Sequence, residues 1–78
     1  MRDTKIKIGE TIRERRELLG LLQPQLATIS GVGLRTLQMV EGGKGNPSLD
    51  ILLQITEPLG LNLQLVLKDM GKKNEEFL

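Results

Sequence analysis

The sequence predicts an all-α core of four helices followed by one C-terminal β-strand, within a single small domain. Three observations predict it. Seventy-eight residues suffice for one hydrophobic core and no more. Apolar residues recur at helical spacing over most of residues 7–59, and glycine, proline or serine stands where the pattern breaks. From position 61 to 67, leucine occupies every second position, which is typical of a strand.

The first helix is predicted over residues 7–19, and Gly20 suits a left-handed cap at its end. Its apolar face should consist of Ile8, Ile12, Leu18 and Leu19. A second helix fits residues 23–29, because Pro24 is tolerated in a first helical turn, where the backbone N–H has no intrahelical partner to lose. Its inner face should consist of Leu26, Ala27 and Ile29.

The third helix is predicted over residues 34–41, after a break at residues 30–33 that is rich in glycine. Leu37 and Val40 should point inward, with Arg35, Gln38 and Met39 facing outward. A loop over residues 42–47 follows. Ser48 is a good N-cap for the fourth helix, and Pro58 and Gly60 end it. Its apolar face should hold Leu49, Leu52, Leu53 and Ile55.

The strand that follows has no partner strand in its own chain. Its alternating residues are Leu61, Leu63, Leu65 and Leu67. Because buried backbone groups need hydrogen-bond partners, we expect residues 62–68 to pair with a second copy as an antiparallel ribbon across a homodimer. The alternative is a fifth helix, since leucine and glutamine are good helix formers. Residues 69–78 are polar and expected to be disordered.

The composition argues against an enzyme. There is no histidine and no cysteine, which removes the usual general base and the commonest metal ligands, so we expect no cofactor and no metal. Phe77 is the one aromatic residue, so stacking platforms for single-stranded nucleic acid are missing as well. No apolar run approaches the length of a membrane span, which predicts a cytoplasmic protein with no membrane partner.

The charges are unevenly distributed although the net charge is only +1. Residues 1–48 hold eight basic and five acidic side chains, a net charge of +3, whereas residues 49–78 carry a net charge of −2. A polyanion would therefore dock on the first part of the chain. The alternative is that these side chains are ordinary solvated charges with no binding role, which would give the same uneven distribution.

Four sequence runs, over residues 20–27, 30–33, 36–42 and 46–50, the last followed by Leu52, resemble the phage-repressor-like (XRE-type) helix-turn-helix family. The resemblance covers about residues 6–61 and implies a lambda-repressor-like DNA-binding domain, with the helix-turn-helix at about residues 23–41. The added strand looks like that of HipB-like antitoxins, which pair through it, repress their own operon and bind a HipA-like kinase toxin.

The resemblance also implies roles for individual residues. Those that would contact double-stranded operator DNA are Gln23, Gly33, Leu34, Arg35, Thr36, Gln38, Met39, Lys44 and Asn46. Arg16 and Glu41 match an ion pair that joins the first helix to the recognition helix. The chain departs from the family at Leu22 and Gly33, where a capping Ser or Thr is usual.

Together with the resemblance, these observations predict a homodimeric transcriptional repressor of the bacterial cytoplasm, associated with the nucleoid. The resemblance implies that it acts as the antitoxin of a HipBA-like operon. One alternative is a free-standing phage or host regulator without a toxin. Another is a protein-interaction module without DNA binding, which the apolar side chains Leu34 and Met39 would favour on the recognition helix.

Overall fold

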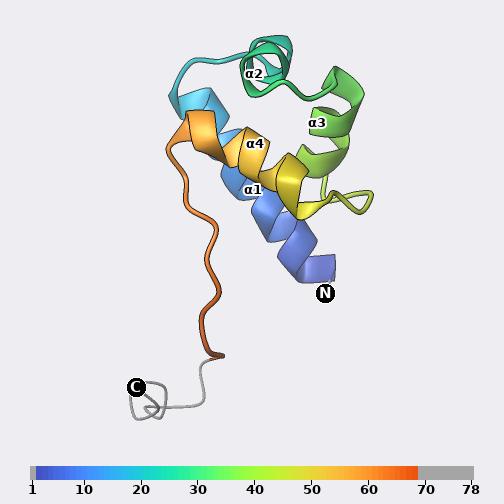
Figure 1. The fold of residues 1–78 in the computed structure, drawn as a ribbon, viewed down its shortest axis with the longest axis vertical. Helices are drawn as coiled ribbons and strands as arrows, with labels where there is room; N and C mark the ends of the chain where they lie inside the picture. The colour runs from blue at the N-terminus through green and yellow to red at the C-terminus, as the bar shows by residue number, and fades with distance from the viewer. Residues whose placement is uncertain (1, 69–78) are drawn as a thin grey trace.

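The computed structural model describes residues 2–68 and consists over that range of four helices (Figure 1). Their bounds are Arg2–Leu18 for α1, Gln23–Ser30 for α2, Leu34–Glu41 for α3 and Leu49–Leu59 for α4. The all-α prediction is confirmed over this range. The tail predicted to be disordered, residues 69–78, lies outside the described residues.

The core lies where α1 and α4 meet the short helices α2 and α3. α1 packs against α3 and α4, and α2 packs against the same two helices. Five large side chains are almost completely buried in it: Ile12, Leu26, Leu37, Ile55 and Leu59. Because every helix contributes at least one of them, the two short helices are held in place by tertiary packing rather than by their own stability.

Local signals fix the ends of the later helices. The Ser48 hydroxyl accepts a hydrogen bond from the Ile51 N–H at 3.1 Å, as an N-cap does. Gly31 ends α2 in the left-handed region at φ 76°, where a β-carbon would be strained. Pro58 lies in the last turn of α4, and the helix ends one residue later, before Gly60. The predicted bounds of α3 are confirmed.

α1 begins at Arg2, five residues before the predicted start. The prediction relied on apolar spacing, which starts at Ile8, but nothing in residues 2–6 breaks a helix. The early turns also contact the loop after α3. The Lys5 ammonium group donates a hydrogen bond to the Gly45 carbonyl at 2.9 Å. This tertiary contact supports the extra turn.

Several side chains predicted to be inward are exposed instead: Leu18, Leu19, Ile29, Leu49 and Leu53. In α2, Leu26 and Ala27 are buried as predicted, but Ser30 takes the inward position expected for Ile29. Ile8 and Leu52 are half-buried against the core. Apolar spacing finds a helical face, but neighbouring helices decide how much of that face is covered.

Residues 61–68 form neither a helix nor a strand in the single chain, so the alternative of a fifth helix is wrong for these residues. The segment leaves the end of α4 and extends away from the helices (Figure 1). Leu61 is half-buried at its base, whereas Leu65 is fully exposed. Strand pairing would require a second chain and stays a prediction. Among residues 2–68, no helix has the length and apolar character to span a membrane.

Candidate nucleic-acid interface

α2 and α3 form a helix-turn-helix through a tightly anchored turn. The Gly31 N–H donates to the Ala27 carbonyl at 2.9 Å and to the Thr28 carbonyl at 3.3 Å. Val32, in the middle of the turn, is buried in the core. The turn is therefore held by the hydrogen bonds of the Gly31 backbone and by the buried Val32 side chain. These contacts fix α3 relative to α2.

α3 has one buried side and one exposed side. Leu37 and Val40 are buried, as predicted, and they attach the helix to the core. The outward residues Arg35 and Gln38 are exposed, and Thr36 is half-buried between the two sides. The side chains that could reach base edges are thus directed away from the protein's interior.

Two apolar side chains share this outward surface. Leu34 and Met39 are each 39% exposed, so neither is taken up by the core. The Met39 methyl group also lies close to Gly45 of the following loop, only 2.9 Å from where a β-carbon on that glycine would stand. Met39 therefore rests against the loop while part of its surface stays accessible.

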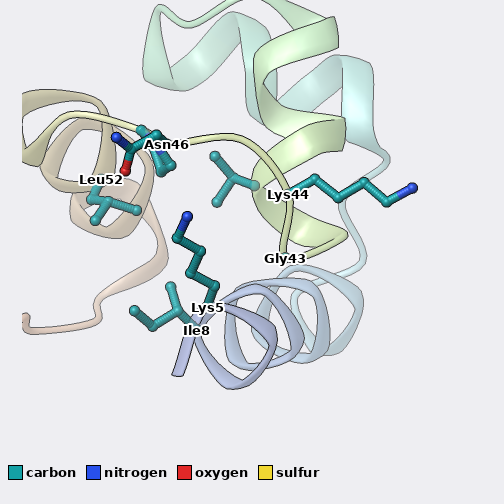
Figure 2. A pocket seen from close by; sticks show the side chains of 8 residues that line it. Lys5, Ile8, Gly43, Lys44, Asn46 and Leu52 are labelled. Carbon is teal, nitrogen blue, oxygen red and sulfur yellow. The ribbon is translucent and has the colours of Figure 1, made fainter. Parts of the chain in front are cut away.

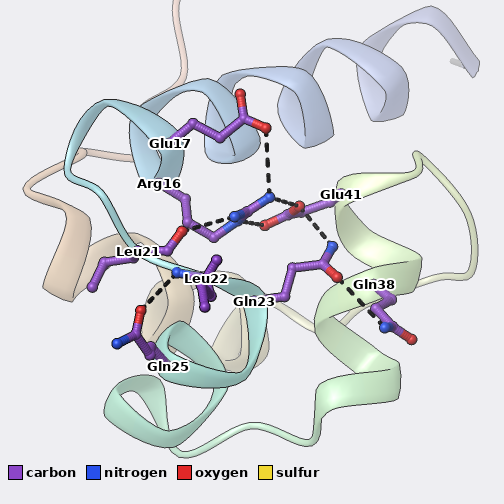
Figure 3. Close-up of polar contacts among 8 residues, drawn as sticks. All are labelled: Arg16, Glu17, Leu21, Leu22, Gln23, Gln25, Gln38 and Glu41. Carbon is purple, nitrogen blue, oxygen red and sulfur yellow. Dashed lines mark hydrogen bonds and ion pairs between the residues drawn. The ribbon is translucent and has the colours of Figure 1, made fainter.

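Arg16 and Glu41 form a bidentate ion pair that joins α1 to the end of α3 (Figure 3). The guanidinium Nε donates to Glu41 Oε2 at 2.7 Å and Nη2 donates to Oε1 at 3.0 Å. Nη1 donates to the Leu21 carbonyl at 2.8 Å. Both residues are only 7% exposed. Hydrogen bonding to Glu41 raises the pKa of Arg16 above its ordinary value, although burial acts in the opposite direction.

Gln23 extends this ion pair toward the exposed surface. Its amide nitrogen donates to Glu41 Oε1 at 3.0 Å, and its amide oxygen accepts from Gln38 Nε2 at 3.5 Å (Figure 3). Gln23 lies at the start of α2 and Gln38 in α3. Side chains from three helices therefore form one polar chain from the buried Arg16 to an outward-facing residue.

The start of α2 is capped without the usual hydroxyl. Leu22 occupies the N-cap position but has no side-chain acceptor for the helix. Instead, the Gln25 side-chain oxygen accepts a hydrogen bond from the Leu22 N–H at 2.8 Å. This is one half of a capping box, so the departure from the family pattern at Leu22 is partly offset. At the N-cap of α3, Gly33 likewise offers no side-chain hydrogen bond.

The loop after α3 carries Lys44 and Asn46, and both are exposed. Figure 2 shows the Lys44 side chain extending away from a small cavity between the loop, α1 and α4. That cavity has a volume of about 120 Å³, below the roughly 300–1,000 Å³ of ordinary ligand pockets. Lys5, which the sequence analysis did not single out, lies at the cavity and holds the loop through Gly45.

Residues 12–66 match the sequence profile described as Helix-turn-helix. The chain belongs to this family. A protein named as an uncharacterized HTH-type transcriptional regulator of Haemophilus influenzae is 42% identical over 59 residues, which are 76% of this chain and 59% of that protein. The chain therefore spans less than two thirds of that relative's length. No solved structure matches the chain significantly.

Two further relatives align with this helix-turn-helix protein over most of their own length. A protein named as an uncharacterized HTH-type transcriptional regulator of Sinorhizobium fredii is 33% identical over 63 residues, which are 81% of this chain and 83% of that protein. The control protein C.SmaI of Serratia marcescens is 32% identical over 95% of this chain and 88% of its own. These relatives are bacterial. They confirm the prediction of an HTH-type transcriptional regulator that is not an enzyme.

Proposed function

We propose that this helix-turn-helix protein binds a palindromic operator as a homodimer and represses transcription by occluding the promoter. The observation that carries the proposal is the exposure of Arg35 and Gln38 on a helix whose opposite side is anchored in the core. In helix-turn-helix proteins, the second helix lies in the major groove and its outward side chains meet base edges. The polar chain through Glu41 supports the same orientation of α3.

The side chains divide into base readers and backbone contacts. Arg35 can bind guanine with two hydrogen bonds, Gln38 can serve adenine, and Leu34 can touch a thymine methyl group. Thr36 and Met39 lie beside them on α3. We assign the contacts with backbone phosphates to Gln23, the Gly33 backbone, Lys44 and Asn46. Contacts of this second kind add affinity and salt dependence but little sequence choice.

Arg35→Ala is expected to weaken specific binding by about 1–3 kcal/mol while sparing much of the non-specific binding. The measurement is a gel shift with the DNA upstream of the gene and with unrelated DNA, at one stated salt concentration. Lys44→Ala is the matched control, because loss of a phosphate contact should weaken both kinds of binding alike.

Two results would contradict these assignments. An equal loss of specific and non-specific affinity in Arg35→Ala would make Arg35 a phosphate contact. If the wild type gave no shift at micromolar protein and low salt, the interaction-module alternative would be favoured. Leu34 and Met39, with 39% of each exposed, would then serve as protein contacts.

The homodimer is proposed to form through the extended segment after α4. Its side chains Leu65, Val66 and Leu67 are largely exposed in the single chain. Contiguous exposed apolar surface is typical of a protein–protein contact. Pairing with a second copy would satisfy the backbone groups of residues 62–68 as well. A dimer of this kind would place the two α3 helices in successive major grooves, about 34 Å apart.

A chain ending after Asn62 is therefore expected to be monomeric and to bind the operator poorly. This end point keeps Leu61, which packs against the core, so the four helices should remain folded. Sedimentation measures the mass in solution, and circular dichroism checks the helical content. A truncated protein that still sediments as a dimer would show that another surface makes the contact.

We further propose that the protein is the antitoxin of a HipBA-like operon and binds a HipA-like kinase toxin. Two features support it: the C-terminal strand pattern, and an uncharged sequence over residues 18–34 that leaves Leu18, Leu22 and Ile29 exposed. An apolar surface of this kind suits a protein partner. The test is co-purification with the untagged product of the neighbouring gene. A gene without a kinase-like neighbour would instead favour a free-standing regulator.

A further inference from the structure

We infer that Arg15 sets the separation of operator half-sites that the dimer accepts, because it is a positioning residue for the C-terminal segment. The inference rests on the proposed homodimer and adds a spacing preference to it. Residues 59–61 are called the exit here, since the segment leaves the end of α4 there, beside the end of α1 (Figure 1). The direction of the exit decides where a second copy would lie.

The Arg15 side chain binds the end of α4. Its Nε donates a hydrogen bond to the Leu59 carbonyl at 2.8 Å, across 44 positions of the sequence. Its Nη2 lies 3.6 Å from where a β-carbon on Gly60 would stand, so the guanidinium lies beside the exit. A cation near the free carbonyls of a helix C-terminus is also favoured by the helix dipole. Arg15 thereby joins α1 to the start of the C-terminal segment.

The backbone of the exit is held by further contacts. Gly60 adopts the left-handed conformation at φ 73°, and its N–H donates to the Glu57 carbonyl at 3.1 Å. The Leu61 N–H donates to the Thr56 carbonyl at 3.1 Å, and the Leu61 side chain is half-buried against the core. Together with the Arg15 bond, these contacts fix the direction in which the rest of the segment leaves the helices.

Residues 62–68 are exposed along their whole length in the single chain. In the proposed dimer they pair with the second copy, so the exit is the last anchored point between each helical domain and the two-fold axis. Its direction then sets the distance between the two α3 helices and their rotation about the DNA. Both quantities must match the operator closely, because each base pair adds about 3.4 Å and about 35° between half-sites.

Loss of the Arg15 bond would loosen the exit and leave its other contacts in place. The segment would then take several directions, and the dimer could fit half-sites at more than one separation. With a rigid exit, a wrong separation forces the DNA to bend or twist, and this deformation costs binding energy. Arg15 therefore serves the spacing preference, whereas the outward side chains of α3 serve the base preference.

The experiment measures binding to operators that differ only in spacing. Palindromic operators are first selected by the wild type from a random duplex library. Dissociation constants are then measured for the selected duplex and for duplexes with one or two base pairs inserted or removed at its centre. For a change of one base pair, we expect the wild type to lose affinity roughly tenfold or more, and Arg15→Met roughly threefold or less.

Two control variants separate the hydrogen bond from other properties of Arg15. Glutamine carries an N–H donor at the same number of bonds from the backbone as the arginine Nε, so Arg15→Gln should retain the wild-type preference. Arg13→Met removes an exposed arginine of the same helix and should also retain it. Sedimentation and thermal unfolding show whether each variant is dimeric and folded. Binding to a duplex with a single half-site shows whether α3 still binds DNA.

A second change tests the exit without altering the helical domain. One glycine inserted between Leu61 and Asn62 leaves the Arg15 bond and the contacts of Leu61 in place. Because a glycine link is flexible, the insertion should relax the spacing preference as Arg15→Met does. This variant keeps the inference testable if Arg15→Met fails to fold, and an unchanged preference in it would contradict a role for the exit.

Two further outcomes would overturn the inference. One is a folded, dimeric Arg15→Met that loses as much affinity as the wild type at every altered spacing, which would place the determinant of spacing elsewhere. The other is a wild type that binds all spacings equally, since its half-sites would then not be rigidly linked. Failure of the proposed function looks different, because the wild type would then select no palindromic sequence.

Discussion

Replacing Glu41 with alanine is expected to lower the free energy of unfolding by about 3–5 kcal/mol, because it leaves the Arg16 guanidinium buried without its partner. The two side chains share two short hydrogen bonds and are almost fully buried. A guanidinium stays protonated in proteins, so Arg16 cannot avoid this cost by losing its proton once Glu41 is removed. Urea unfolding followed by circular dichroism measures the loss.

The size of this loss matters because a small domain has only about 5–15 kcal/mol of stability in total. Arg16 would keep its bond to the Leu21 carbonyl, so we expect a value near the lower end of the range. The same variant frees Gln23, whose amide nitrogen bonds to Glu41. Operator binding should therefore fall even at temperatures where the variant remains folded.

Two further variants test the cause. Glu17 lies 3.9 Å from Arg16 but its side chain is 62% exposed, so Glu17→Ala should cost less than about 1 kcal/mol. The double variant Arg16→Met with Glu41→Leu removes both charges and should be more stable than Glu41→Ala alone. If Glu41→Ala unfolds at the same urea concentration as the wild type, the pair is not desolvated in solution and the argument is wrong.

The sequence predicted the helices best where the chain carries a strong local signal. The bounds of α3 follow from the flanking glycines, and the start of α4 follows from the Ser48 hydroxyl. These signals act between near neighbours, so one sequence is enough to interpret them. The start of α1 was placed too late because residues 2–6 are held by a distant contact, from Lys5 to Gly45.

The candidate site was predicted less completely, for a similar reason. The outward position of Arg35 and Gln38 follows from helical spacing alone. The ion pair between Arg16 and Glu41 came from the family resemblance, since nothing local links residues 25 positions apart. The bonds from Gln23 to Glu41 and Gln38 depend on how α2 crosses α3. Packing of this kind does not follow from the spacing of apolar residues.

The need for glycine at position 9 also comes from the packing of two helices. Gly9→Ala is expected to destabilise the fold by about 3 kcal/mol. A β-carbon at Gly9 would lie 2.6 Å from the Glu41 carbonyl oxygen and would also overlap the Val40 carbonyl oxygen. Both obstacles are backbone atoms, which cannot swing aside as a side chain could. The glycine therefore lets α1 approach the end of α3, where Glu41 meets Arg16.

Helix propensity predicts the opposite sign for this substitution. Gly9 lies in the middle of α1, and alanine is favoured over glycine there by about 1 kcal/mol. Gly42→Ala is the matched control, because its φ of −84° suits any residue and a β-carbon would come no nearer than 3.4 Å to the Gln38 carbonyl oxygen. We expect that variant to change stability by less than about 0.5 kcal/mol. A higher midpoint of thermal unfolding for Gly9→Ala than for the wild type would mean that α1 and α3 do not approach this closely, and the placement of Glu41 beside Arg16 would then need another cause.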